Sequence, residues 1–316
     1  MAASPAPAEY PGPWVALVGC GRWGRLILRD LASLGCRVTV VATSEDSRAN
    51  AVQGGALSVV ASVSELPTVA GAVVAVPASL HGQVVSQLLP LGIPVFVEKP
   101  LTCDPVEAAR LARAGTGRLF VMDKWRYHAG VELLAGLVRS GELGPLLALR
   151  TLRLSWGRPH EDVDGIWTLL PHDLAIVQEI LGTLPPARAA SAARSGKDAI
   201  ALTAFLGETP SVTLAVSTHA PYRRREVEVQ CRDGIALLRD GYCDHVEVWR
   251  GGPEQAQAAE PERRPFSGEM PLLRELRCFV EHLGGGPPPR SSPEEGAAAV
   301  TRISELRRLA GLDGHP

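Results

Sequence analysis

The chain is 316 residues long, and its 46% hydrophobic and 21% charged residues are typical of a folded globular protein. The formal net charge of -2 supplies no basic field for nucleic acid and no polybasic surface for a membrane. Apolar stretches are short and interrupted, so no segment is expected to span a bilayer, and the length predicts two domains.

Residues 1–13 are rich in alanine and proline and contain neither a basic segment nor a long apolar core. They are predicted to form a disordered leader and not a signal peptide. Six cysteines are scattered without C-x-x-C spacing, which predicts reduced structural thiols in a cytoplasmic protein. They are Cys20, Cys36, Cys103, Cys231, Cys243 and Cys278.

Between residues 14 and 124, short apolar runs alternate with segments of helical periodicity. The expected strands are 14–18, 38–42, 57–60, 73–76, 95–97 and 119–122, and the helices include 23–34, 80–91 and 105–114. Strands that alternate with helices of this length indicate βαβ units. Residues 14–124 are therefore predicted to form a Rossmann domain with a doubly wound parallel sheet.

Strands dominate after about residue 124. They are expected at 146–154, 199–206, 212–218, 226–231, 235–238 and 245–249, with helices at 131–140, 171–181, 270–283 and from residue 293. The segment 226–231 alternates polar and apolar residues, as in an antiparallel sheet with one covered face. Residues 125–316 are predicted to form an α+β domain with a large, mostly antiparallel sheet for substrate binding and oligomerisation. Its C-terminal helices could pack back on the Rossmann domain.

A glycine-rich turn, Gly19-Cys20-Gly21-Arg22-Trp23-Gly24, joins the first strand to the first helix. In a dinucleotide site the first glycine makes the tight turn, the second lets the backbone approach the pyrophosphate, and the third allows close helix packing. The helix N-terminus adds free N–H donors. Glycines can serve a tight turn alone, but this context predicts a dinucleotide site that includes Arg22 and Trp23.

The end of the second strand bears on the choice between NAD and NADP. NAD sites usually carry an acidic residue about 20 residues beyond the glycine turn. Here the strand ends at Thr43 and Ser44, and Arg22 and Arg48 are expected nearby. Hydroxyls and cations favour the 2′-phosphate of NADP, while NAD stays possible because Glu45 could turn back toward the ribose.

Glu98-Lys99-Pro100 directly follows the apolar strand 95–97. Open α/β sheets bind their ligands at the carboxyl ends of the strands. Burial at such a place lowers the pKa of a lysine and suits it to proton exchange. The ordinary alternative is a lysine paired with Glu98 or Glu142.

With both motifs placed, the chain resembles the Gfo/Idh/MocA oxidoreductase family over residues 14–310. Further segments match the family's motifs in order: Val74-Ala75-Val76-Pro77 with His81, residues 91–101, Trp125-Arg126-Tyr127-His128, residues 140–144, and Pro171-His172-Asp173-Leu174. The resemblance implies a Rossmann domain and a large sheet domain with the active site between them.

The resemblance also implies roles for single residues. Lys99 would contact the reacting hydroxyl or carbonyl, and His172 would donate or accept its proton or bind the substrate. Pro77, His81 and Glu98 would lie in the cofactor site.

One position departs from the family, because Thr168 stands where an aspartate often precedes the histidine by four residues. Threonine cannot supply a negative charge, so Asp164 or Asp173 would have to substitute. Since Pro171 is expected to open a helix, His172 is predicted in its first turn, where the helix dipole favours a neutral imidazole. A histidine that only caps this helix is the alternative.

Other candidates are less specific. Possible substrate-binding side chains, each equally explained by packing, are Arg126, Tyr127, Trp167 and Asp173. The run Arg223-Arg224-Arg225 is predicted as a solvated turn, with contact to a phosphate as the alternative. No metal site is predicted, because His160, Glu161 and Asp162 are adjacent and lack ligand spacing.

Together, the motifs and the resemblance predict an NAD(P)-dependent oxidoreductase. It would transfer a hydride between the nicotinamide and a carbinol or carbonyl carbon of a sugar-like or cyclitol substrate, as a cytoplasmic homodimer or homotetramer. One alternative is a noncatalytic dinucleotide-binding sensor, which the missing aspartate favours. Others are a redox-neutral glycosidase that uses its cofactor transiently, and reduction of an imine or enone.

Overall fold

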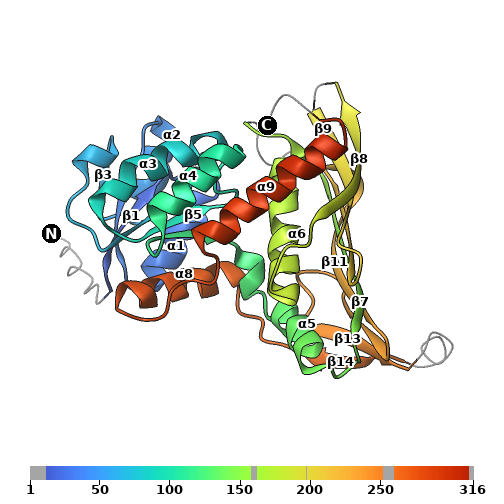
Figure 1. Ribbon diagram of the computed structural model, residues 1–316. Coiled ribbons are helices and arrows are strands. Elements are labelled where there is room, and N and C mark those ends of the chain that lie inside the picture. The colour runs from blue at the N-terminus through green and yellow to red at the C-terminus, as the bar shows by residue number, and fades with distance from the viewer. Residues whose placement is uncertain (1–11, 158–161, 197, 252–259, 313–316) are drawn as a thin grey trace.

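The computed structural model describes residues 12–157, 162–196, 198–251 and 260–312. Of the predicted leader, Gly12 and Pro13 alone lie within these ranges. Figure 1 shows two bodies side by side, a layered α/β domain and a large sheet with helices on the face toward it.

The N-terminal domain contains a six-stranded parallel sheet in the order β3-β2-β1-β4-β5-β6. Its strands are β1 (Trp14–Val18), β2 (Arg37–Val41), β3 (Ser58–Val60), β4 (Gly71–Val74), β5 (Val95–Glu98) and β6 (Leu119–Met122). The chain order reverses between β1 and β4, which is the crevice where doubly wound sheets bind ligands. The prediction of a doubly wound parallel sheet is confirmed.

Helices cover both faces of this sheet, which is why its strands are nearly continuous apolar runs. They are α1 (Gly24–Ser33), α2 (Glu45–Gln53), α3 (His81–Leu88) and α4 (Pro105–Gly115), with short 3-10 turns η1 (Val63–Glu65), η2 (Ala78–Leu80) and η3 (Leu89–Leu91). One core joins the sheet to α3 and α4, and the other joins it to α1 and to the later helix α8 (Pro271–Leu283). In the second core the rings of Phe96 and Phe279 stack with their centroids 5.0 Å apart.

The second domain is built on an eight-stranded sheet in the order β14-β13-β12-β11-β7-β10-β9-β8. Its strands are β7 (Leu146–Trp156), β8 (Ala187–Ser195), β9 (Asp198–Leu206), β10 (Ser211–Ser217), β11 (His219–Cys231), β12 (Gly234–Leu238), β13 (His245–Arg250) and β14 (Glu262–Pro265). Neighbouring strands are antiparallel except for the parallel pair β7–β10. This confirms the predicted, mostly antiparallel sheet.

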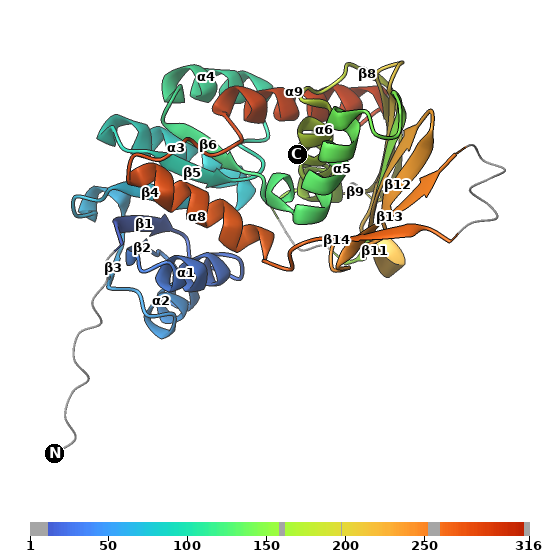
Figure 2. The same ribbon diagram turned by 90° about the horizontal axis from the view of Figure 1, so that it is seen from below.

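Helices of the second half pack on one face of this sheet and reach back to the first domain. They are η4 (Lys124–Tyr127), α5 (Ala129–Ser140), α6 (Gly165–Leu181) and α9 (Pro293–Leu309). Helix α9 contacts α4 of the Rossmann domain and also α6 and β8, and α8 packs on α1. Figure 1 shows α8 beneath the parallel sheet, and Figure 2, seen from below, shows α8 in front of that sheet and α9 running from one body to the other.

The predicted start of α6 (Gly165–Leu181) is wrong. Helix α6 begins at Gly165, because the Asp164 carboxylate caps it by accepting from the Ile166 and Trp167 amides at 2.9 and 3.2 Å. Pro171 therefore lies inside the helix and does not open it.

The arginine run 223–225 lies within β11 and not in a turn, and β8 had not been expected at all. Strand β8 is rich in alanine and serine, which are poor strand formers, and its pairing with β9 outweighs that preference.

All six cysteines are free thiols in the structure. Within the described ranges, no helix combines the length and the apolar character that crossing a membrane requires.

Candidate active site

The glycine turn joins β1 to α1, as predicted. Gly19 has a φ of +93°, and a Cβ at this position would lie 2.7 Å from the carbonyl oxygen of Ala75. A Cβ on Gly24 would collide with the carbonyl oxygen of Gly19. On Gly21, in contrast, it would meet no described atom within 4 Å. Two glycines are thus required by the fold, whereas Gly21 borders open space before the α1 N-terminus.

This open space suits the pyrophosphate of a dinucleotide. No described side chain caps α1, and the Arg25 and Leu26 amides donate to the Gly21 and Trp23 carbonyls at 3.1 and 2.9 Å, so an anion here would meet the glycine turn in front of these amides and the positive end of the helix dipole. The turn is held from behind by α2, because the Ser47 hydroxyl accepts from the Cys20 amide at 2.9 Å and the Asn50 amide donates to the Cys20 carbonyl at 3.0 Å. The residues present therefore fit the phosphates of such a cofactor.

The predicted 2′-phosphate residues lie at the adjoining strand end. Thr43, Ser44 and Arg48 are exposed just beyond β2, and Arg22 is exposed in the glycine turn. The Ser44 hydroxyl caps α2 by accepting from the Ser47 amide at 3.2 Å.

Trp23 connects the glycine turn to the end of β5. Its indole N–H donates to the Glu98 carboxylate, and the Lys124 ammonium lies 4.1 Å from the centroid of its ring. Burial raises the pKa of Glu98 and lowers that of Lys124 to about 8. Lys124 was not among the predicted site residues, although it follows the end of β6 as Lys99 follows β5.

His81 holds the ends of β4 and β5 together. Its Nδ1 lies 2.6 Å from the carbonyl oxygen of Pro100, and its Nε2 lies 3.1 Å from that of Val76. Burial lowers the pKa of His81, and a neutral ring donates through one nitrogen, so we assign the proton to Nδ1 at the shorter contact. Pro77 precedes η2 directly beside it.

Lys99 and His172 come together at α6. The Lys99 ammonium donates to the backbone carbonyl of Thr168 at 3.2 Å, one helical turn before His172. Burial lowers the pKa of Lys99. Burial also lowers the pKa of His172 well below its usual value, and the charge of Lys99 adds to this effect. His172 is thus neutral, but through burial and neighbouring cations in mid-helix, not through the predicted helix N-terminus.

The Nδ1 of His172 is buried and has no hydrogen-bond partner among the described residues. A neutral imidazole with a free ring nitrogen can form a hydrogen bond with a substrate hydroxyl, and a neighbouring amine of lowered pKa gives up its proton more readily than an ordinary lysine. The pair has the chemistry of a general acid–base site.

At Thr168, where the family often has an aspartate, a backbone carbonyl and not a side-chain carboxylate contacts Lys99. The Thr168 hydroxyl donates to the carbonyl oxygen of Asp164 at 3.0 Å, while its own carbonyl accepts from Lys99. Asp164 caps α6 and pairs with Arg307 at 2.5 Å. Asp173 is buried and pairs with Arg153 at 2.6 Å. Both candidate substitute carboxylates are therefore engaged by arginines.

Protein contacts also occupy the other predicted substrate ligands. Trp167 is buried in the second domain, and the Tyr127 hydroxyl accepts from the Arg290 amide at 2.8 Å. Arg126 pairs with Glu179 at 3.1 Å and with Glu295 at 2.9 Å. Substrate binding by Arg126, Tyr127, Trp167 and Asp173 stays a prediction.

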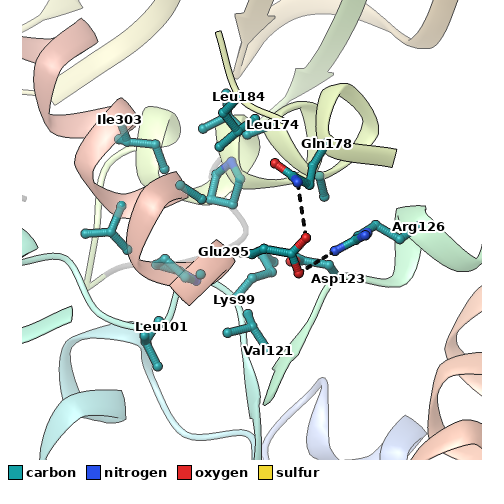
Figure 3. Close-up of a pocket in the computed structure, with 16 residues that line it drawn as sticks. Lys99, Leu101, Val121, Asp123, Arg126, Leu174, Gln178, Leu184, Glu295 and Ile303 are labelled. Carbon is teal, nitrogen blue, oxygen red and sulfur yellow. Dashed lines mark hydrogen bonds and ion pairs between the residues drawn. The ribbon is translucent and has the colours of Figure 1, made fainter. Parts of the chain in front are cut away.

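A pocket lies between α6, α9 and the strand ends of the Rossmann domain (Figure 3). The labelled residues around it are Lys99, Leu101, Val121, Asp123, Arg126, Leu174, Gln178, Leu184, Glu295 and Ile303. Glu295 accepts from Gln178 at 3.1 Å and from Arg126 at 2.9 Å. These three side chains therefore form one hydrogen-bonded group on the polar side of the pocket (Figure 3). Burial raises the pKa of Asp123 there to about 6. Lys99 lines this pocket, whereas His172 does not.

In the described residues, no group of three His, Cys, Asp or Glu side chains is arranged to hold a metal ion. His160 and Glu161 lie outside those residues, and the Asp162 carboxylate accepts from the Ser79 amide at 3.0 Å.

Known proteins match this chain in sequence and in fold. Residues 14–118 match the GFO_IDH_MocA family model, described as an oxidoreductase family with an NAD-binding Rossmann fold. Inositol 2-dehydrogenase of Renibacterium salmoninarum is 32% identical over 145 residues, which cover 43% of this chain and 44% of that protein. Inositol 2-dehydrogenase of Streptomyces avermitilis is 27% identical over 309 residues, covering 90% and 88%.

Among solved structures, UDP-N-acetylglucosamine 3-dehydrogenase GnnA from Acidithiobacillus ferrooxidans has the same fold. It superposes with a TM-score of 0.81 at 20% identity, over 95% of this chain and 99% of that one. The order of the motifs, the two-domain fold and the family match agree. Residues 14–118 match the model of the Gfo/Idh/MocA oxidoreductase family, and the NAD-binding Rossmann fold of that family is the fold of the N-terminal domain.

Proposed function

We propose that this protein is an NAD(P)-dependent dehydrogenase or reductase that acts on a CH–OH group of a sugar-like or cyclitol substrate. The observation that carries the proposal is the contact of Lys99 with the α6 turn that precedes His172, at the sheet edge that also bears the glycine turn. The similarity to inositol 2-dehydrogenases supports a cyclitol or a related polyol.

When bound, a nicotinamide dinucleotide supplies the hydride acceptor or donor. The chain's own part is to bind the substrate oxygen and move its proton. In oxidation of a carbinol, the C–H bond gives up its hydride and the hydroxyl proton passes to the Lys99 amine or the His172 imidazole. In reduction of a carbonyl, the same groups return that proton to the oxygen.

The first test is a fluorescence titration with NADPH and NADH, followed by turnover assays with myo-inositol and a panel of sugars and their keto forms. Binding in the micromolar range and turnover of at least one polyol are expected. Failure to bind either nucleotide would contradict the proposal at its first step.

A noncatalytic sensor is the second candidate, and the absence of an acidic side chain at Thr168 favours it. A sensor would bind the nucleotide but turn over no member of the panel. The backbone contact from Lys99 to Thr168 supports the enzyme instead, because it positions the amine without that acid.

We infer that NADP is the preferred cofactor, because the strand end beyond β2 offers two hydroxyls and Arg48 to a 2′-phosphate. An Arg48→Glu variant should lose affinity for NADPH by about tenfold while keeping its affinity for NADH. Arg139→Glu, at an exposed position of α5, is the matched control. Tighter binding of NADH than of NADPH by the unmodified protein would contradict the inference.

We also propose that copies of the chain associate through the second domain as a dimer or tetramer. The described helices of this domain pack on one face of its sheet, which leaves the opposite face available (Figure 1). Light scattering coupled to size exclusion should give a mass at least twice 33.5 kDa. A monomer at micromolar concentration would rule this arrangement out.

A further inference from the structure

Two arginines on β11 lack a carboxylate partner. Arg223 and Arg225 both donate to the hydroxyl of Tyr242, at 2.8 and 3.1 Å, and their guanidinium carbons lie 5.0 and 5.5 Å from the centroid of its ring. Neither forms an ion pair with a carboxylate anywhere in the described part of the chain. Arg224, between them, is paired with Glu226. Tyr242 thus holds both guanidinium groups without neutralising them, and of the two Arg223 is exposed and Arg225 half-buried.

The pairing of β7 with β11 brings a further positive charge close to Arg225. Arg225 lies directly opposite Arg153 in the β7–β11 pair, and like charges at opposed positions destabilise a sheet. The carboxylate of Asp173 neutralises Arg153. The pKa of Arg225 is lowered by burial and then by the charges of Arg153 and Arg223.

Arg225 lies on the face of the sheet that the helices cover, whereas Arg223 is exposed. Arg225 shares its side of β11 with the buried Val227 and Val229, because alternate residues of a strand point to the same face. The charge of Arg225 contributes to the lowered pKa of His172, together with those of Lys99, Arg153 and Lys124. The geometry agrees, because Arg153, opposite Arg225 in the sheet, pairs with Asp173, which directly follows His172 in α6.

We propose that Arg223 and Arg225 form an anion subsite on the His172 side of the active site, outside the lining of the pocket in Figure 3, and that the substrate is a polyol bearing a carboxylate or a phosphate. This inference rests on the proposed function and names its substrate class. A guanidinium presents a fork of N–H donors that matches both oxyanions, and the shared contact with Tyr242 orients the two groups before the ligand arrives. The bound anion would neutralise the charge that the register concentrates beside His172.

Steady-state kinetics with matched sugars tests the subsite. D-glucose, D-glucuronate and D-glucose 6-phosphate differ in charge but share a ring, so the carboxylate and the phosphate are separate arms. We expect kcat/KM for one of the acidic sugars to exceed that for D-glucose by about tenfold or more. In Arg225→Gln this ratio should fall by about tenfold, mainly through KM. Arg224→Gln, on the opposite face of β11, is the matched control and should leave the ratio unchanged.

Thermal unfolding gives a readout that does not depend on turnover. Inorganic phosphate and D-glucuronate should each be tested for a rise in the Tm of the nucleotide-bound protein. A rise with at least one of them is expected for the unmodified chain and for Arg224→Gln, but not for Arg225→Gln. Because Arg225→Gln removes a like-charge opposition, its Tm without ligand should be no lower than that of the unmodified chain.

The outcomes separate the two proposals. If neither these sugars nor myo-inositol and the rest of the panel are turned over, the proposed function fails, and the Tm comparison still decides on the anion subsite. If D-glucose is used as well as the acidic sugars and Arg225→Gln keeps the same ratio, the subsite is wrong while the dehydrogenase stands. An equal rise of Tm in Arg225→Gln would also overturn the subsite.

Discussion

Lys99 sits where three features of the site converge: the end of β5, the α6 turn at Thr168 and the interdomain pocket. Its reduced pKa results first from burial, so its reactivity depends on the closed packing around it. The activity should therefore depend more on the amine of Lys99 than on the exact volume of its side chain.

Replacing Lys99 by Met should lower kcat by roughly 10²–10⁴-fold, because the amine would no longer exchange the hydroxyl proton. Nucleotide affinity should be preserved, since the phosphates bind at the glycine turn. Lys99→Arg, which keeps the charge but cannot give up its proton near neutral pH, separates the proton role from a purely electrostatic one. Full turnover by Lys99→Met would remove Lys99 from the mechanism.

Glu275 of α8 is an unusual buried acid. It is fully buried, and both of its carboxyl oxygens lack a hydrogen-bond partner among the described residues. Burial raises the pKa of Glu275 well above its usual value, and the charge of Glu98 adds to this. The folded protein therefore retains a proton that the unfolded chain releases above about pH 4.3. The stability that this proton contributes is complete below that pH and is lost as the pH rises through the folded pKa.

A Glu275→Gln variant should lose this pH dependence and be more stable than the parent above neutral pH, by about 1 kcal/mol or more. Urea unfolding across the acid-to-alkaline range measures it. Glu281→Gln, at an exposed position of the same helix, is the control and should follow the parent curve. A parallel loss of stability in Glu275→Gln and parent at alkaline pH would show that Glu275 is not the titrating group.

At the scale of elements, α6 combines a strong cap with an internal proline. Asp164 accepts two backbone N–H groups at the N-terminus and pairs with Arg307 of α9, so one carboxylate both starts α6 and joins it to α9. Pro171 cannot donate to the carbonyl of Trp167, which leaves one helical hydrogen bond unmade beside His172.

The two roles of Asp164 can be separated by substitution. Asp164→Asn keeps a good cap but removes the charge that faces the buried Arg307, and should cost about 3 kcal/mol of unfolding free energy. Asp164→Ala removes the cap as well and should cost about 1 kcal/mol more. Chemical denaturation of both variants measures the difference. Equal losses would mean that the cap contributes nothing.

Elements with strong local signals were predictable from the sequence. The parallel strands are uninterrupted apolar runs, and the glycine turn follows β1 directly. The start of α6 was not predicted, because proline is common in a first helical turn and Pro171 masked the cap at Asp164. The strand position of Arg225 was not predicted either, because three adjacent arginines are typical of a solvated turn. Their place in β11 depends on pairing with β7, which the local sequence does not show.

Within the site, the sequence identified Lys99 and His172 but not their surroundings. Lys124 could have been found by the same rule that singled out Lys99. Leu149, Thr151 and Arg153 alternate along β7. The alternation could have predicted that the Arg153 side chain lies on the buried face of the sheet. The contact of Lys99 with a backbone carbonyl could not be predicted, because every residue has a main-chain oxygen and the sequence does not show which one is contacted.

At the scale of the whole molecule, nucleotide binding should be visible as stabilisation. At a nucleotide concentration of 100 Kd the unfolding free energy should rise by about 2.7 kcal/mol. A Gly21→Val variant should keep the parent Tm without ligand, since its side chain would point into open space. It should lose the nucleotide-induced rise, because the same space is where the pyrophosphate would lie.

Gly24→Ala is the contrasting variant, since its Cβ collides with the Gly19 carbonyl and should lower the Tm even without ligand. A nucleotide-induced rise of normal size in Gly21→Val would place the cofactor elsewhere.

Helix α9 limits how the two domains can move. It contacts α4 of the Rossmann domain and α6 and β8 of the second domain, so a wide hinge opening would have to slide it out of one of these interfaces. Substrate exchange should therefore proceed by small shear displacements and side-chain rearrangement, within a cleft whose width is nearly fixed before either ligand arrives.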